Sequence, residues 1–95
     1  MNTSISIVFE AEACRSAAYD NGKFIGQCVF RGEGSNKWVI TLTEVTPSYS
    51  GKSIARMLVK KVIEEARANN MKIIPFCSYA RNMMKEDEFK DVLVQ

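Results

Sequence analysis

The chain contains no histidine, and this absence excludes more chemistry than any other feature of its composition. Without an imidazole there is no Ser-His-Asp triad, no Cys-His pair and no histidine-bound zinc. Catalysis in this chain would therefore have to use carboxylate, thiol, hydroxyl, amine or backbone groups.

Cysteine and proline are scarce, and the charges nearly cancel. Cys14, Cys28 and Cys77 lie far apart without a Cys-x-x-Cys pair, which indicates reducing conditions. Thirteen basic and eleven acidic side chains leave a net charge of +2, and the basic ones are scattered. This balance argues against nucleic acid or a membrane surface as a partner. The first residues lack the pattern of a signal peptide or membrane span, so we expect a cytoplasmic protein.

The first half of the chain predicts antiparallel strands. Apolar and polar residues alternate over residues 4–9, and a second short strand is expected over 15–19. Asn21-Gly22 follows, and this pair is a strong hairpin signal because both residues tolerate positive φ. The return strand is expected over 24–30. With 95 residues, 46% of them hydrophobic, we expect one domain over residues 1–95.

The second half predicts a strand, a helix and a further strand. Residues 37–45 are rich in β-branched side chains, and Pro47 ends that strand. Residues 54–70 carry one apolar stripe at helical spacing, and residues 71–76 form the next strand, parallel to the first. Pro75 favours an edge, a bulge or an early parting of that strand from its neighbour.

Three further signals refine this prediction. Gly26, inside the return strand, indicates a bulge or a close approach of two backbones. Ser78 is suited to cap a second helix. Phe89, Val92 and Leu93 indicate a small closing helix.

The loop between the strand and the long helix predicts an anion site. Gly51 and Lys52 stand at its mouth, next to the free N–H groups of a helix start, and phosphate is the usual anion there. Gly51-Lys52-Ser53 matches the end of the G-x-x-x-x-G-K-[ST] motif. However, Thr46 occupies the position of the first glycine, and Pro47 follows it. We therefore disfavour a nucleotide-hydrolysing P-loop.

Two sequence blocks around the long helix resemble a known family. The first is Thr43-Glu44-Val45 with a glycine-containing loop that ends Ile54-Ala55, and the second is the sequence IPFCSY over residues 74–79. Both are similar to the short, single-domain N-acetyltransferases of the GNAT acetyltransferase superfamily. The resemblance implies an α+β fold, the minimal acyl-CoA N-acyltransferase core, in which antiparallel strands precede a β-α-β crossover and a C-terminal helix.

The resemblance also implies a cofactor, acetyl-CoA or coenzyme A. In the family, the backbone near Val45 holds the pantetheine arm and the loop through Ala55 holds the pyrophosphate. The implied cofactor-binding residues are Val45, Thr46, Ser50, Gly51, Lys52, Ser53, Ile54, Ala55 and Tyr79. The acetyl group would go to a primary amine whose identity the sequence does not give, and we expect a monomer or a weak homodimer.

Two residues are candidates for catalysis. Glu44 could remove a proton from the attacking amine, or it could be a strand carboxylate with a structural partner such as Lys37. The resemblance implies that Cys77 could accept the acetyl group, and the alternative is a small buried core residue. Both alternatives stay open for both residues.

Three positions depart from the family pattern. Ser53 stands at a glycine, Ser50 at a glutamine or arginine, and Leu42 at a histidine. The two serines are expected to weaken cofactor binding, and Leu42 removes a titrating group near the reaction centre. The sequence therefore leaves three functions: an N-acetyltransferase, by direct attack or through Cys77; a CoA-binding module without turnover; and an interaction protein that has lost the ligand.

Overall fold

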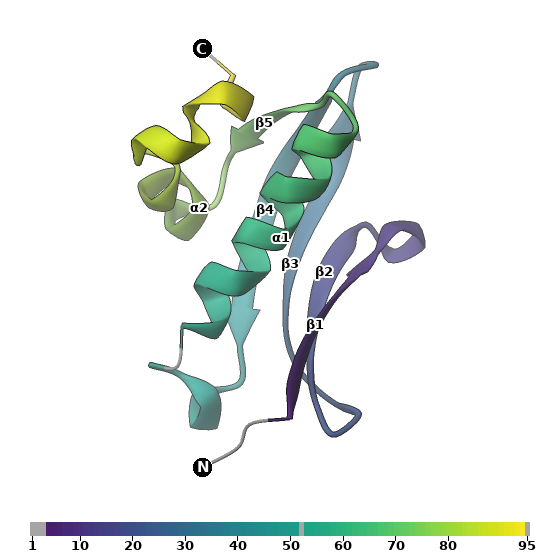
Figure 1. The fold of residues 1–95 in the computed structure, drawn as a ribbon, viewed down its shortest axis with the longest axis vertical. Helices are drawn as coiled ribbons and strands as arrows, with labels where there is room; N and C mark the ends of the chain where they lie inside the picture. Colours follow the sequence, from purple (N-terminus) through teal and green to yellow (C-terminus); the bar gives the residue numbers. More distant parts are fainter. Residues whose placement is uncertain (1–3, 52, 95) are drawn as a thin grey trace.

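The structure is a computed structural model that describes residues 4–51 and 53–94. The described residues form one five-stranded sheet, in the order β1-β2-β3-β4-β5, with a long helix across one face (Figure 1). The strands are β1 Ile5–Glu10, β2 Arg15–Asp20, β3 Lys23–Glu33, β4 Lys37–Val45 and β5 Lys72–Pro75. The helices are α1 Ile54–Ala68 and α2 Ser78–Met83, with 3-10 turns η1 Ala11–Ala13, η2 Pro47–Tyr49 and η3 Asp87–Val92.

The predicted order of elements is confirmed, with small differences at the ends of elements. The first four strands pair antiparallel, and β5 joins β4 in parallel through α1. Helix α1 ends at Ala68, and Asn70 then takes a left-handed conformation with φ of 58°. The closing helix is a 3-10 turn, because Asp87–Val92 is a short segment held by contacts with α1. No helix within the described residues is long and apolar enough to cross a membrane.

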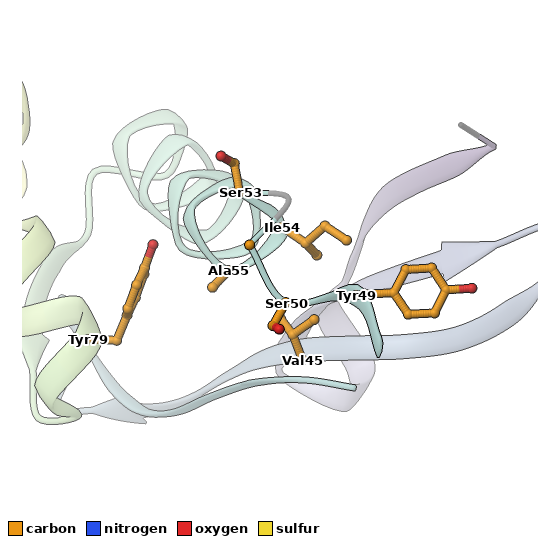
Figure 2. Close-up of a pocket in the computed structure, with 8 residues that line it drawn as sticks. Val45, Tyr49, Ser50, Ser53, Ile54, Ala55 and Tyr79 are labelled. Atoms are coloured by element: carbon orange, nitrogen blue, oxygen red, sulfur yellow. The ribbon is translucent and has the colours of Figure 1, made fainter. Parts of the chain in front are cut away.

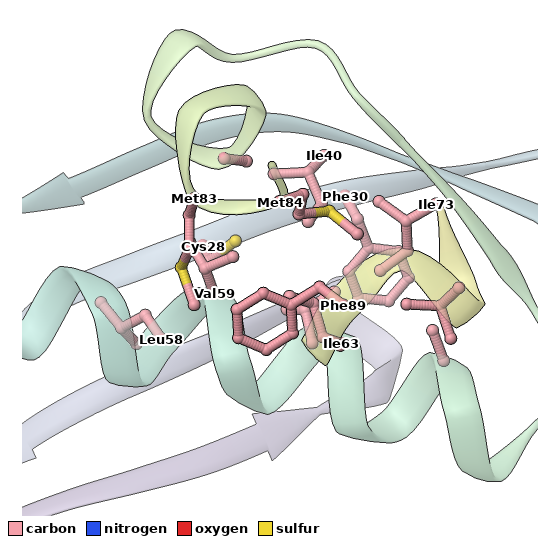
Figure 3. Close-up of a cluster of buried hydrophobic side chains, with 14 of the residues drawn as sticks. Cys28, Phe30, Ile40, Leu58, Val59, Ile63, Ile73, Met83, Met84 and Phe89 are labelled. Carbon is pink, nitrogen blue, oxygen red and sulfur yellow. The ribbon is translucent and has the colours of Figure 1, made fainter. Parts of the chain in front are cut away.

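The hydrophobic core lies between α1 and the sheet. The apolar stripe predicted for α1 is buried, and the C-terminal segment adds Met84 and Phe89, which close the core beside β5 (Figure 3). Trp38 in β4 stacks on Phe30 in β3, with ring centroids 4.3 Å apart. This packing fixes α1 against the strands, and so fixes where α1 begins relative to the end of β4.

Strand β4 contains a bulge at its centre. Val29 pairs with Leu42 and Phe30 pairs with Ile40, so that Thr41 is an extra residue between them. Such a bulge bends the strand and increases its local twist. The second half of β4 therefore runs in a different direction from the first half.

Strands β4 and β5 separate at this bulge. Their parallel pairing runs from Lys37 with Lys72 to Ile40 with Pro75 and then stops. The carbonyl of Ile40 accepts the last two hydrogen bonds, from the N–H groups of Phe76 at 3.0 Å and Cys77 at 3.1 Å. Beyond Ile40, no strand in the described part of the chain pairs with this side of β4. The early parting, one of the outcomes expected of Pro75, is confirmed.

Gly26 lies at a close approach of the β3 and β4 backbones, one of the two outcomes expected from its position in the strand. A Cβ atom added there would lie 2.8 Å from the carbonyl oxygen of Glu44 and 3.2 Å from the Cα of Val45. Both atoms belong to the backbone, which cannot move aside without disturbing the end of β4. The residue therefore helps to set the position of the strand end.

We expect Gly26→Ala to lower the free energy of unfolding by about 2 kcal/mol, because the added methyl group overpacks this contact. Urea denaturation followed by circular dichroism measures the change. Gly32→Ala is the matched control, since a Cβ at this position in the same strand meets nothing within 4 Å. An equal loss in both variants would contradict the assignment of close packing to Gly26.

Candidate functional site

The open edge of β4 presents backbone groups from two residues. The N–H of Thr46 donates to the carbonyl of Ile25 at 2.8 Å, so the N–H of Thr46 points toward β3. In an antiparallel pair, successive residues alternate between pointing toward the partner strand and away from it. Val45 and Thr43 therefore direct their N–H and C=O groups into the gap that β5 leaves.

A cavity of about 320 Å³ lies between the end of β4 and the start of α1 (Figure 2). Its described lining is Val45, Tyr49, Ser50, Gly51, Ser53, Ile54, Ala55 and Tyr79. In Figure 2, Tyr79 reaches in from α2, on the side of the cavity opposite Tyr49. The structure thus brings together seven of the nine residues expected to bind a cofactor.

The other two residues expected to bind a cofactor are Thr46 and Lys52. Thr46 does not line this cavity; it lines a second hollow of about 280 Å³, at the start of β3 and the end of β4. Lys52 lies outside the described residues, so its expected role stays a prediction. The positive charge of Arg56, in the first turn of α1, is paired with Glu86 through two hydrogen bonds of 2.8 Å. The described lining residues of the larger cavity carry no formal charge.

The first turn of α1 begins without a side-chain cap. Ser53 precedes the helix in a left-handed conformation, with φ of 64°, and its side chain makes no capping hydrogen bond within the described chain. The first helical bond runs from the N–H of Met57 to the carbonyl of Ser53, at 3.1 Å. The N–H groups before Met57 have no intrahelical acceptor, and they carry the positive end of the helix dipole. An anion in the cavity would meet these groups.

Tyr49 also lines the cavity, although it is not among the residues expected to bind a cofactor. Its ring belongs to η2, and its hydroxyl donates a short hydrogen bond to a carboxylate oxygen of Asp20, at the end of β2. This bond, with some burial, raises the pKa of the Tyr49 hydroxyl. The loop that walls the cavity is therefore tied to the sheet. The only sequence signal was an aromatic residue between Pro47 and Gly51.

Cys77 lies where β4 and β5 separate, at the start of α2. It is half-buried, and its sulfur accepts a hydrogen bond from the N–H of Ala80 at 3.4 Å. The cap of α2 is therefore Cys77, and the prediction of Ser78 was wrong by one residue because Ser78 is already helical. The hydroxyl of Thr43 lies 3.4 Å from the Cys77 sulfur and 3.6 Å from that of Cys28. Cys77 is not among the residues that line the cavity.

Cys28 is fully buried behind Thr43. Burial is the main cause that raises the pKa of its thiol to about 12, and the hydrogen bond from Thr43 lowers it in part. This thiol is therefore protonated at neutral pH. Its place in the core is that of a small apolar packing residue.

Glu44 points to the opposite face of β4 from Thr43, because successive side chains alternate along a strand. Its carboxylate is exposed and accepts a hydrogen bond of 2.6 Å from the side-chain amide of Gln27 in β3. Glu44 lines the smaller hollow, together with Phe24 and Thr46. The partner is thus Gln27 rather than Lys37, and the structure does not place Glu44 and Cys77 side by side.

The family of the chain follows from a match that covers most of it. The family model described as GCN5-related N-acetyl-transferase matches residues 15–92. The chain belongs to this family. The expected acyl-CoA N-acyltransferase fold is confirmed. The sheet in which β4 and β5 separate after Ile40 is the central sheet of this fold.

Solved structures agree with this assignment. A GCN5-like candidate N-acetyltransferase from Staphylococcus aureus is 30% identical, with a TM-score of 0.76 over 96% of this chain and 89% of the other. A predicted acetyltransferase from Clostridium acetobutylicum, solved with acetyl-CoA, shares 22% identity and a TM-score of 0.57 over 79% of this chain and 57% of the other.

A more distant structure has the same fold within a larger protein. N-acetylglutamate synthase from Neisseria gonorrhoeae, solved with coenzyme A and N-acetylglutamate, is 14% identical, with a TM-score of 0.60 over 73% of this chain and 19% of the other. At this identity the likeness shows the fold alone. No curated protein sequence matches the chain significantly.

We expect Ser53→Gly to raise the free energy of unfolding by about 0.5 kcal/mol, because glycine adopts positive φ without the steric cost that serine bears. The Ser53 side chain makes no cap that the change would remove. Guanidinium denaturation measures the difference. Ser50→Gly is the control, since Ser50 is extended, with φ of −66°, and glycine there should only destabilise. A loss of stability in Ser53→Gly would contradict the strained conformation.

Proposed function

We propose that the protein is a small acetyl-CoA-dependent N-acetyltransferase that transfers an acetyl group to a primary amine. The observation that carries the proposal is the parting of β4 from β5 at Ile40, next to the uncapped start of α1. Val45 belongs to both features, because its backbone faces the gap and its side chain lines the cavity. The two features together form one continuous site.

The residues present fit the two ends of coenzyme A. An extended arm that contains amides can pair with the free backbone groups of Thr43 and Val45 as an added strand would. A diphosphate can accept hydrogen bonds from the N–H groups at the start of α1, with Ser50 and Gly51 beside it. Tyr79, across the cavity, would cover the bound arm. Of the residues expected to bind the cofactor, those around the cavity keep that role in the proposal.

The cofactor would supply the acetyl thioester, so the chain needs to provide few catalytic groups of its own. Holding an amine close to the acetyl carbon provides most of the rate in such a reaction, so direct attack needs few catalytic groups. Glu44 is the carboxylate available to take the proton of the amine, directly or through water. Cys77 is the nucleophile available for a covalent route, at the point where the strands part.

A CoA-binding module without turnover is the second candidate. It is favoured by the position of Glu44, which lies on the other face of β4 from Cys77 and is already bonded to Gln27. Leu42, with 42% of its surface exposed, adds no titrating group at this place. Under this alternative the gap and the cavity keep their ligand, and only the chemistry is lost.

The first test is binding of acetyl-CoA to Val45→Pro, measured by calorimetry. Proline removes the N–H that faces the gap, and we expect the dissociation constant to rise about tenfold or more, as the loss of a backbone hydrogen bond and its pairing geometry predicts. The fold should remain, because an edge position whose N–H points away from the neighbouring strand tolerates proline.

Val45→Ala is the matched control for this test. It shortens the side chain that lines the cavity but keeps the N–H, so its affinity should fall less than that of Val45→Pro. Equal affinities of Val45→Pro and the parent would contradict a role for the open edge. A parent protein that shows neither heat of binding nor a thermal shift with millimolar coenzyme A would overturn the proposal, because a specific ligand raises the melting temperature.

The second test is turnover with a panel of primary amines. We expect acetyl-CoA to be consumed only when an amine is present, and mass spectrometry should find the acetylated amine. Cys77→Ala separates the two routes: unchanged turnover leaves direct attack, whereas lost turnover together with an acetyl group on Cys77 of the parent supports the covalent route. Binding without turnover across the panel would favour the second candidate.

A further inference from the structure

Two exposed hydrophobic side chains stand where β4 and β5 part. Phe76, which follows β5, is 69% exposed, the highest value among the large hydrophobic side chains of the described residues, and Leu42 in β4 is 42% exposed. Exposed apolar side chains that gather at one place, unlike scattered ones, are typical of binding surfaces. The proposed function gives neither side chain a contact with a ligand.

Both side chains point away from α1, which lies across the other face of the sheet (Figure 1). Thr43 contacts the sulfur of buried Cys28, so its neighbour Leu42 points to the opposite face, because side chains alternate along a strand. Cys77 packs against the core in extended conformation, and by the same alternation Phe76 points away from the core. Leu42 and Phe76 therefore stand on one face, on opposite sides of the gap.

The core closes the gap on the face toward α1. Thr43 and Cys77 extend from the two sides of the gap, and the Thr43 hydroxyl lies 3.4 Å from the Cys77 sulfur. Cys28 is buried behind them. A molecule that reaches this part of the gap without displacing the core must therefore enter past Leu42 and Phe76.

Glu44 places a negative charge on the same face. It is two residues beyond Leu42, roughly 7 Å along the strand. One carboxylate oxygen accepts a hydrogen bond of 2.6 Å from the Gln27 amide, and the other accepts none within the described residues. Arg15 donates to the side-chain oxygen of Gln27 at 2.9 Å, which directs the Gln27 amide nitrogen toward Glu44. The carboxylate is thus held in place with one oxygen available to a ligand.

The cations on neighbouring elements are bonded to other groups. Arg15 forms an ion pair with Glu10 at 2.7 Å, and Arg31 forms one with Glu33 at 3.1 Å. Arg81 in α2 donates to the carbonyl of Phe76 at 2.9 Å. Glu44 itself has no ion-pair partner among the residues that the structure describes. A cationic ligand therefore complements the charge of this face.

We propose that Leu42, Phe76 and Glu44 form a binding site for a primary amine with an apolar body, such as an arylalkylamine. The ammonium group binds the free oxygen of Glu44, and the apolar body packs on Leu42 and Phe76. The role of this site as the acceptor site rests on the proposed function, whose substrate class it names. A compact aliphatic amine would leave both hydrophobic side chains in water.

The test compares 2-phenylethylamine with ethylamine, two probes with the same ammonium group and different bodies. Each is titrated into the protein, with and without millimolar coenzyme A, and nuclear magnetic resonance follows the Leu42 methyl groups and the amides of Phe76 and Glu44. We expect these signals to shift, and the dissociation constant of 2-phenylethylamine to be about tenfold lower than that of ethylamine, because its ring leaves water.

Three variants assign the contacts. Phe76→Ser and Leu42→Ser should each weaken binding of 2-phenylethylamine about fivefold and change binding of ethylamine less. Glu44→Gln, which keeps the shape but loses the charge, should weaken both amines alike, about threefold, as expected of an exposed ion pair. Val8→Ser is the matched control for the apolar contacts, since Val8 is as exposed as Leu42 and lies in β1, away from the gap.

Two results would overturn the inference. One is an equal affinity for the two amines, both with and without coenzyme A. The other is an equal loss of affinity in Phe76→Ser and Val8→Ser, because a general effect on the surface would not distinguish these positions.

The same probes separate this inference from the proposed function. Binding of 2-phenylethylamine at Leu42 and Phe76 by a protein that does not bind coenzyme A would support the site and overturn the proposed function. Turnover of both amines with equal KM values would support the proposed function and overturn the inference. If both are correct, Phe76→Ser should raise the KM for 2-phenylethylamine about fivefold and that for ethylamine less.

Discussion

The site depends on a single carbonyl group. The oxygen of Ile40 accepts hydrogen bonds from two successive N–H groups, those of Phe76 and Cys77, and these are the last backbone bonds that join β4 to the chain leaving β5. Pro75 has no N–H to give, and Thr41 is the extra residue of a bulge, so neither can extend the ladder. The gap, the free backbone groups and the place of Cys77 all follow from this end of pairing.

The two faces of β4 have different chemistry as a result of strand alternation. Thr43 faces the core and contacts both sulfurs, whereas Glu44 faces outward and is bonded to Gln27. The backbone groups of Thr43 and Val45 face the gap. A ligand bound along this edge would therefore have thiol and hydroxyl groups on one side and a carboxylate on the other. Which of these groups the proposed amine acceptor contacts would depend on the side from which the amine enters.

Much of the fold could be predicted from the sequence, because the signals were local. The Asn21-Gly22 turn, the apolar stripe of α1 and the proline in β5 each report on a short segment, and each was confirmed. The bulge at Thr41 could not be predicted, since it depends on how Phe30 and Ile40 pair across two strands. The cap of α2 was placed one residue late because both Cys77 and Ser78 offer a side chain that can accept.

The site was only partly predictable, because only those of its residues that are close together in the sequence form a recognisable motif. The residues of the loop and the start of α1 are consecutive, so a motif could collect them, and the structure places them around one cavity. The contacts of Thr43 with two cysteines and of Tyr49 with Asp20 join positions far apart in the chain. No spacing rule in a single sequence reports such contacts, which depend on the finished sheet.

The hydrogen bond between Tyr49 and Asp20 connects the β2–β3 hairpin to the wall of the cavity. Asp20 is the last residue before the Asn21-Gly22 turn, and the turn itself contributes no side chain to the cavity. A shorter, longer or stiffer turn would move Asp20 and, with it, the wall of the cavity. Natural variation in this remote turn would thus change the shape of the cavity while every residue that lines it is left intact.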